Sequence, residues 1–274
     1  MGRGERDIFG TPASTPADEG FARFAGVATP LCAFDAENSH VTAWQAGRSN
    51  VNGMPSGTDG NPNHIVYLHV YDGDGLDVLN ECLRIGCPPF ALVAIKPACW
   101  NDDLTPWECP GLFADDSPFA GHAIRQLHLL EEIIIPQVER ECSKPGTPRI
   151  CRTIAGYSLA GLFATWAAFN SSAFSRIASA SGSLWYPDFA RFVAERQLAR
   201  PIDCTYFSLG NKEAKTPSRL LRNVATGTDE VVAAFRSKGI PTQFETNPGN
   251  HFKEPALRMA RGITWTVSQQ ATNR

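Results

Sequence analysis

The segment Arg149–Phe169, RICRTIAGYSLAGLFATWAAF, contains the transition around which the rest of the chain is organised. Residues 150–155 alternate and then run apolar, as in a buried strand of a parallel sheet. Residues 159–169 are small and apolar with helical spacing and contain no proline. The two halves meet at GYSLAG, residues 156–161. The sequence therefore predicts a strand that stops at Ser158 and turns at once into a helix.

This strand–serine–helix turn is typical of the nucleophile elbow of α/β-hydrolases. The serine of such an elbow takes a strained backbone conformation, so the residues two before and two after it must be small. Here these residues are Gly156 and Ala160. The turn also directs the first helical N–H groups, that of Leu159 above all, at an oxyanion formed over Ser158. An ordinary strand-to-helix connection is the alternative interpretation.

Charge and composition exclude several classes of function. The 274-residue chain has a net charge of −3 and no basic run, which argues against nucleic-acid binding. No apolar stretch is long enough to cross a bilayer, so no membrane partner is expected. Residues 1–20 are polar and lack the apolar part of a secretory signal, which predicts a flexible N-terminal segment on a cytoplasmic protein. Residues 21–274 contain no linker and predict a single domain; monomer and homodimer both stay open.

The chain contains eight cysteines, none of them in a C-x-x-C pair. Neither a zinc ribbon nor a thioredoxin-like redox motif is therefore indicated. Reduced thiols in a reducing compartment are the simplest interpretation. The alternative is a disulfide between Cys82 and Cys87, or between Cys99 and Cys109.

Strand and helix patterns alternate from residue 65 to the end of the chain. Strands are predicted at 65–71, 90–95, 150–155, 174–181, 204–209 and 242–246. Helices are predicted at 77–86, 120–142, 159–169, 189–198, 219–238 and from 255 onwards. This alternation predicts an α/β fold with a mostly parallel central sheet and helices on both faces.

The part of the chain before residue 65 is harder to interpret. Residues 21–34 show no clear period, and residues 41–48 predict an early edge strand. Residues 49–63 are dense in Asn, Gly, Pro and Ser and predict a loop. Later in the chain, Pro136 is expected to bend the long helix predicted at 120–142.

A serine hydroxyl is too weak an acid to attack an ester unaided, so Ser158 needs a base within hydrogen-bond reach. In α/β-hydrolases the chain order is nucleophile, acid and histidine. Of the six histidines only His251 lies downstream of Ser158, in a loop of Asn, Pro and Gly after the last predicted strand. His251 is therefore the candidate base, and a loop histidine without a chemical role is the alternative.

The acid is expected just beyond the strand predicted at 204–209. Asn211 fits by position, but it cannot carry the charge that steadies an imidazolium. Glu213 is therefore the candidate acid. A glutamate at the start of a helix is also favoured by the helix dipole alone, and this alternative stays open.

The second oxyanion donor is expected in the loop after the first central strand, Asp72–Gly75. The glycines of this loop let the backbone approach a substrate closely. The N–H of Asp74 is the preferred donor, and that of Gly73 is the neighbouring choice. A metal loop is the weaker interpretation, because the spacing lacks the later glutamate of a calcium loop.

Six runs of sequence occur together in the order of one protein family. They are YDGDG at 71–75, NDDLTP at 101–106, GYSLAGLFA at 156–164, SASGSLWY at 179–186, SLGNKEAKT at 208–216 and NPGNHF at 247–252. Together they resemble the esterase branch of the α/β-hydrolase superfamily that includes the esterase D-like and enterochelin-type siderophore esterases. The resemblance extends from about residue 65 to the C-terminus.

The resemblance implies a role for five positions. Matched residue by residue, it assigns the nucleophile to Ser158, the base to His251, the acid to Glu213, and the oxyanion N–H groups to Leu159 and Asp74. Because some members of the branch work with a serine–histidine dyad, the resemblance leaves triad and dyad open.

Three residues depart from the family pattern. Tyr157 replaces the common histidine beside the nucleophile, and Ala160 replaces a glycine. Asn101 stands where family members often carry arginine, which argues against an anionic iron–siderophore as substrate.

The substrate is expected to contact the loop at 96–118, which contains Asp103, and the aromatic pair Trp185 and Tyr186. Plain packing is the alternative for these residues. The sequence thus predicts a metal- and cofactor-independent serine hydrolase of small-molecule carboxylic esters, with a siderophore-type ester as one option. An acyltransferase with the same residues and a non-catalytic binding protein on the same fold are the alternatives.

Overall fold

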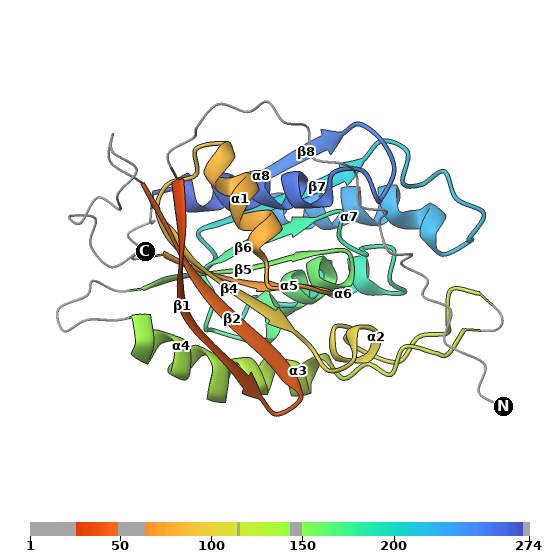
Figure 1. Ribbon diagram of the computed structural model, residues 1–274. Helices are drawn as coiled ribbons and strands as arrows, with labels where there is room; N and C mark the ends of the chain where they lie inside the picture. The colour runs from red at the N-terminus through yellow and green to blue at the C-terminus, as the bar shows by residue number, and fades with distance from the viewer. Residues whose placement is uncertain (1–25, 49–63, 114–115, 143–149, 271–274) are drawn as a thin grey trace, which may run out of the picture.

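The computed structural model describes residues 26–48, 64–113, 116–142 and 150–270 (Figure 1). Two predictions lie outside the described residues: the flexible segment at 1–20 and the loop at 49–63.

The described strands form one eight-stranded sheet in the order β1-β2-β4-β3-β5-β6-β7-β8 (Figure 1). Their bounds are β1 Gly26–Ala36, β2 Ser39–Arg48, β3 His64–His69, β4 Phe90–Lys96, β5 Cys151–Tyr157, β6 Arg176–Ala180, β7 Cys204–Gly210 and β8 Thr242–Asn247. Strands β3 to β8 pair in parallel, whereas β1–β2 and β2–β4 pair antiparallel. The prediction of a mostly parallel sheet is confirmed.

The edge-strand prediction for residues 41–48 is wrong. Strand β2 lies inside the sheet, because β1 pairs with one of its sides and β4 with the other. On this side of the described sheet the edge strand is β1, which the sequence pattern did not reveal. The pairing register of β1 shifts between Pro30 and Cys32, and such an irregularity interrupts the two-residue alternation by which a strand is recognised.

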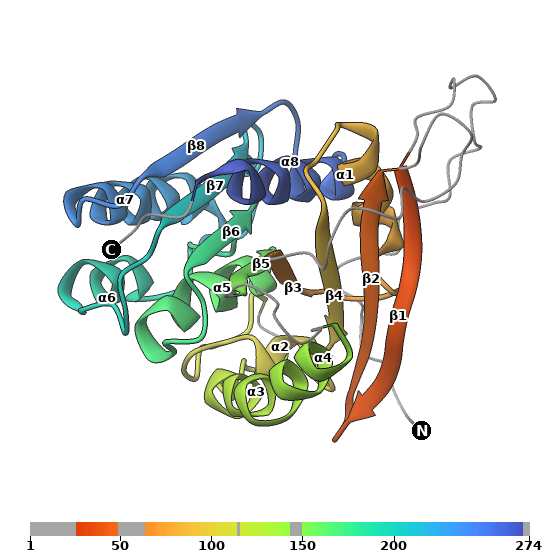
Figure 2. The same ribbon diagram turned by 90° about the vertical axis from the view of Figure 1, so that its left-hand side faces the viewer.

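The helices form two layers, one on each face of the sheet (Figure 2). Their bounds are α1 Leu76–Arg84, α2 Trp100–Asp103, α3 Ala123–Leu129, α4 Ile135–Cys142, α5 Leu159–Asn170, α6 Phe189–Glu195, α7 Val224–Ser237 and α8 Pro255–Ser268. Helices α1 and α8 pack together on one face, and α3 to α7 lie on the other (Figure 2). This arrangement confirms the predicted helices on both faces.

The predicted helix at 120–142 is interrupted where Pro136 was expected to bend it. Helix α3 gives way to a π-helical turn at Leu130–Ile134, and α4 then carries Pro136 in its first turn. Proline has no N–H to donate, and its ring clashes with the carbonyl four residues earlier. The wider turn accommodates the proline, so the disturbance takes the form of a π-turn.

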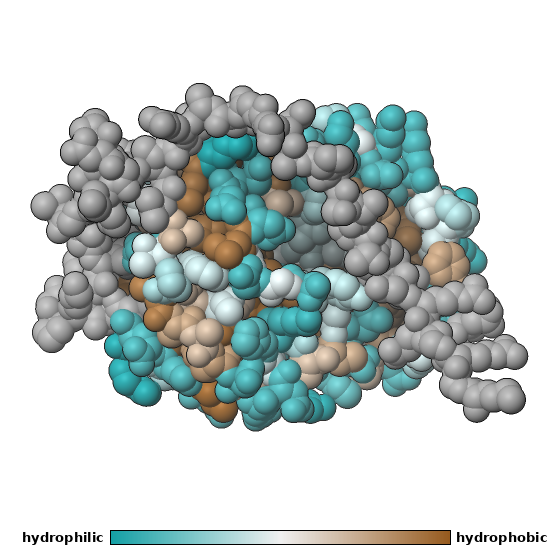
Figure 3. All heavy atoms as spheres, viewed as in Figure 1, coloured by the Kyte–Doolittle hydropathy of each residue, from teal (hydrophilic) through white to brown (hydrophobic). Residues whose placement is uncertain are grey.

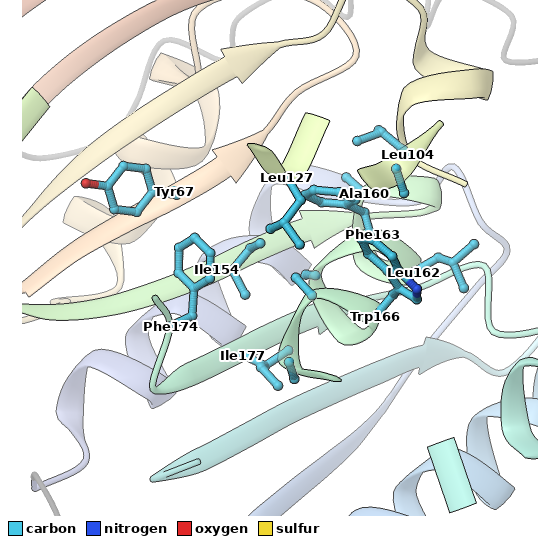
Figure 4. Close-up of a cluster of buried hydrophobic side chains, with 14 of the residues drawn as sticks. Tyr67, Leu104, Leu127, Ile154, Ala160, Leu162, Phe163, Trp166, Phe174 and Ile177 are labelled. Carbon is cyan, nitrogen blue, oxygen red and sulfur yellow. The ribbon is translucent and has the colours of Figure 1, made fainter. Parts of the chain in front are cut away.

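Helix α5, which follows Ser158, is buried on nearly all sides. Its residues from 159 to 168 are all buried, as expected for a helix that is apolar all round. Figure 4 shows Phe163 and neighbouring α5 side chains packed among Leu127 of α3, Ile154 of β5 and Ile177 of β6. Each large apolar side chain buried here contributes about 2 kcal/mol. The core therefore anchors the helix whose first turn borders the candidate site.

Two features of the described residues bear on the predictions about membrane segments and disulfides. On the face shown in Figure 3, hydrophobic residues form separate small areas among hydrophilic ones. None of the helices in the described ranges is both long and apolar enough to span a bilayer. The seven cysteines whose side chains are described are all free thiols, including Cys82, Cys87, Cys99 and Cys109.

Candidate active site

Ser158 occupies a sharp turn between β5 and α5. Its backbone has φ 60° and ψ −123°, a conformation that costs a non-glycine residue about 1–3 kcal/mol. A Cβ atom on Gly156 would lie 2.2 Å from the carbonyl carbon of Ala160, so only glycine fits there. The methyl group of Ala160 is fully buried in the core, and the turn accommodates it.

Backbone hydrogen bonds hold this strained turn in place. The carbonyl of Ser158 accepts the N–H of Leu162 at 3.1 Å and that of Ser183 at 2.9 Å. The N–H of Ser158 donates to the carbonyl of Ala180 at 3.3 Å, which ties the turn to the end of β6. The helix and the neighbouring strand thus fix the position of the serine hydroxyl.

The structure brings Ser158, His251 and Glu213 together although they come from three separate loops. Nε2 of His251 lies 3.1 Å from Oγ of Ser158, and Nδ1 lies 2.7 Å from Oε2 of Glu213. Each loop follows a parallel strand: β5, β8 and β7 respectively. Because the carboxyl ends of parallel strands share one edge of the sheet, residues 93 positions apart meet there.

The second carboxylate oxygen of Glu213 has three donors. Oε1 accepts the N–H of Gly210 at 2.6 Å, the hydroxyl of Ser181 at 2.8 Å and the guanidinium of Arg258 at 3.0 Å. The side chain of Glu213 is only 3% exposed. Burial raises the pKa of this carboxyl, but its bonds to His251, Gly210 and Ser181 outweigh burial and hold the pKa below the ordinary value.

An ionised Glu213 determines which nitrogen of His251 carries the proton. A carboxylate can only accept, so the proton between the two side chains lies on Nδ1 of the histidine. In the neutral imidazole Nε2 is then the unprotonated nitrogen, and it lies where it can accept a hydrogen bond from the hydroxyl of Ser158. This is the arrangement that a general base requires.

The two predicted oxyanion donors lie at the same edge of the sheet. Leu159 is the first residue of α5, so its N–H has no acceptor within the helix. Asp74 lies in the loop after β3, the strand beside β5. Its carbonyl accepts bonds from Thr42 at 3.1 Å and Trp44 at 2.9 Å, which tie the loop to β2. Both roles stay predictions.

An open groove of about 680 Å³ lies against the loop of Asp74. It is lined by Asn38, His40, Asp72, Gly73, Asp74, Lys96, Pro97 and Ala98. An ion pair of 2.6 Å between Lys96 and Asp72 crosses its wall. The groove leaves space for part of a bound molecule beside the predicted oxyanion donor.

The three residues predicted to bind substrate are largely buried. The carboxylate of Asp103 accepts the N–H of Cys99 at 2.8 Å. Trp185 and Tyr186 pack against Phe119, and the Tyr186 hydroxyl donates to the carbonyl of Trp107 at 2.6 Å. These interactions hold Cys99, Trp107 and Phe119 of the loop around residues 99–119 in place. A direct role in substrate binding stays a prediction.

Three residues that contact the site were given no role in the sequence analysis: Tyr157, Ser181 and Arg258. The hydroxyl of Tyr157 donates to the main-chain carbonyl of His251 at 2.6 Å. Ser181 has φ 45° and, like Ser158, directly follows a parallel strand. A polar residue at the carboxyl end of a central strand is the signal that marks Ser181. Arg258 gives no signal, because one arginine in an amphipathic helix is normally solvent-exposed.

Known proteins show which fold class this architecture defines. No family model matches the chain. In sequence, it is 28% identical over 184 residues to the uncharacterized protein YbbA of Bacillus subtilis, an alignment of 65% of this chain and 73% of YbbA.

The solved structures have lower identity but nearly full coverage. The siderophore hydrolase EstB from Aspergillus nidulans superposes with a TM-score of 0.63 at 20% identity, over 95% of this chain and 99% of EstB. EstA from the same organism superposes with a TM-score of 0.61 at 21% identity, over 94% of this chain and 99% of EstA. The enterobactin hydrolase IroE in complex with DFP superposes with a TM-score of 0.62 at 18% identity, over 90% of this chain and 98% of IroE. The chain has the α/β-hydrolase fold, which confirms the fold predicted from the motifs.

Proposed function

We propose that this protein is a serine hydrolase that cleaves carboxylic esters through an acyl-enzyme on Ser158. The observation that carries the proposal is the continuous hydrogen-bonded series from Ser158 through His251 to Glu213, with distances of 3.1 and 2.7 Å. This series lies at a strained nucleophile turn, the other feature that ester hydrolysis by a serine requires.

The proposed reaction uses these contacts in turn. Nε2 of His251 takes the proton of Ser158 as its oxygen attacks the ester carbonyl. The imidazolium that forms is stabilised by the ionised Glu213 and then gives its proton to the leaving alcohol. Water activated by the same nitrogen hydrolyses the acyl-enzyme and restores the serine.

Negative charge develops on the carbonyl oxygen during each half of the reaction. We assign its stabilisation to the N–H groups of Leu159 and Asp74. The N-terminal end of α5 adds the positive end of a helix dipole. The loss of one such donor typically costs about 10²–10³-fold in kcat.

The proposed substrate class is a small-molecule ester. EstA, EstB and IroE are hydrolases of siderophores or of enterobactin, and they share this fold over nearly the whole chain. Their likeness supports ester cleavage but leaves the individual ester to experiment. The groove beside Asp74 gives room for one portion of such a substrate.

The test compares wild type with Ser158→Ala. Hydrolysis of p-nitrophenyl acetate, p-nitrophenyl butyrate and a siderophore trilactone is measured for both proteins. We expect the variant to lose at least about 10³-fold in kcat, because the nucleophile is gone. A fluorophosphonate probe is expected to label wild type on Ser158 and to leave Ser158→Ala unlabelled.

Ser208→Ala is the matched control, since Ser208 is a buried serine on β7 that is not assigned to the site. It is expected to keep wild-type activity and labelling. A wild-type protein that neither hydrolyses any of these esters nor reacts with the probe would refute the proposal and favour a binding protein on this fold.

A further inference from the structure

Arg258 of α8 is a buried arginine that contacts Glu213, the candidate acid of the site. Its side chain is 2% exposed. One guanidinium nitrogen donates to Oε1 of Glu213 at 3.0 Å, to the hydroxyl of Ser181 at 3.2 Å and to that of Tyr157 at 3.3 Å. The other donates to the carbonyl of Pro248 at 3.0 Å. Three loops at the carboxyl edge of the sheet thus converge on one cation.

These contacts reach His251 by two routes. The first route runs through Glu213, whose other oxygen accepts from Nδ1 of His251. The second runs through Tyr157, whose hydroxyl donates to the main-chain carbonyl of His251. Arg258 therefore holds both the orientation of the carboxylate and the loop that carries the imidazole. A planar guanidinium suits this task because it offers several donors in a fixed geometry.

We propose that Arg258 is a positioning residue that holds Glu213 against His251 and sets the pH at which this pair takes up its proton. The inference rests on the proposed serine-hydrolase function. The positive charge of Arg258 makes it less favourable to add a proton to the pair of Glu213 and His251. Loss of this charge is therefore expected to favour the protonated form of the pair.

Three elements supply the acid of the pair and the charged or titratable groups that contact the pair. Arg258 comes from α8, Glu213 from the loop after β7, and Tyr157 from the end of β5. Burial raises the pKa of Tyr157 to about 12, so its hydroxyl stays neutral throughout the working range. Among these contacting groups Arg258 supplies the fixed positive charge.

The test compares Arg258→Gln with wild type in two measurements. The first is the pH profile of kcat/KM for a p-nitrophenyl ester. The second is an NMR titration of the His251 imidazole in the full chain, assigned by its absence in His251→Ala. In Arg258→Gln we expect the acid limb and the imidazole midpoint to move up by about one pH unit. The sign does not depend on which member of the pair holds the proton, since loss of a cation favours either protonated form.

Arg258→Lys keeps the positive charge but loses the planar guanidinium group and its fixed set of donors. We expect its midpoint to stay within about 0.3 pH unit of wild type, while kcat falls by about tenfold at all pH values. Arg176→Met is the matched control, because Arg176 is also a 2% exposed arginine bound to α8, through the carbonyl of Thr266 at 2.6 Å. It is expected to lower the melting temperature and leave the pH profile unchanged.

An unchanged midpoint in Arg258→Gln, with kcat lowered equally at every pH, would overturn the proposal and leave Arg258 a structural residue. Should Arg258→Gln not fold, Arg258→Met is the second charge-free variant. Should neither fold, a shifted midpoint in Arg258→Lys, which keeps the charge, would contradict the proposal. The serine-hydrolase function and the role of Arg258 can be refuted independently. A wild type without esterase activity refutes the hydrolase function, whereas the NMR titration still tests the role of Arg258.

Discussion

Two buried arginines lie at opposite ends of the same sheet and illustrate two uses of a buried charge. Arg176 begins β6 and donates to the carbonyl of Thr266 near the end of α8. Arg258 lies near the start of α8 and donates to Ser181, just beyond the end of β6. The same strand and helix are thus joined by an arginine at each end, yet only Arg258 contacts the carboxylate of the candidate site.

The difference lies in what surrounds each arginine. At the carboxyl end, Ser158 and Ser181 have positive φ values of 60° and 45° and come directly after β5 and β6. At the amino end, the buried polar groups near Arg176 include His64, which bonds to Thr153 at 2.7 Å. Two strained residues thus lie beside the proposed chemistry. The buried polar groups at the amino end instead connect strands and helices to one another.

The largest effect is expected from Glu213→Gln, which removes the charge of the acid and keeps its shape. An uncharged amide no longer stabilises the imidazolium, so kcat should fall by about 10³-fold. The measurement is ester hydrolysis at pH 8 with Glu245→Gln as control, since Glu245 bonds to Tyr206 and Arg261 away from the serine. Near-normal activity in Glu213→Gln would instead indicate a serine–histidine dyad.

An intermediate effect is expected on stability at the amino end as the pH falls. Burial, with the charge of Arg176, lowers the pKa of His64 from 6.5 to about 3. The unfolded chain takes up a proton here below about pH 6.5 and the folded chain does not, so acid favours unfolding. The stability that His64 contributes is complete above this pH and is about 2 kcal/mol smaller at pH 5.

His64→Gln should remove this part of the pH dependence without changing activity per folded molecule. The measurement is urea unfolding at pH 7 and pH 5, with the exposed His40→Gln as control. An identical loss of stability between the two pH values in wild type and His64→Gln would contradict the assignment. A change in the activity of His64→Gln would contradict the proposal that the amino end of the sheet serves stability and the carboxyl end serves catalysis.

The smallest effect is expected from Tyr157→Phe. This change removes the 2.6 Å hydrogen bond to the carbonyl of His251 and leaves the ring in place. A lost hydrogen bond of this kind is worth about 1 kcal/mol, so kcat should fall by about fivefold with little change in KM. Steady-state kinetics decide this, and full wild-type activity would show that other contacts suffice to hold the His251 loop.

The tertiary structure shows why some features were predictable. The elbow at Gly156–Gly161 was recognisable because its steric demands are local: glycine is the only residue that fits at position 156. His251 and Glu213 could be selected as candidates because the chain order of this fold places base and acid after successive strands, and the structure brings both close to Ser158. In contrast, β1 was missed because its irregular register around Pro30 hides the strand period.

By itself, the sequence determined the alternation of strands and helices, the parallel sheet and the turn at Ser158, since each depends on residues close together in the chain. Only the tertiary structure decided which polar side chains meet. Arg258, Ser181 and Tyr157 lie on different elements and converge through the packing of α8 against the sheet. Burial of a charged group depends on partners that are distant in sequence, and local sequence patterns do not predict which partners these are.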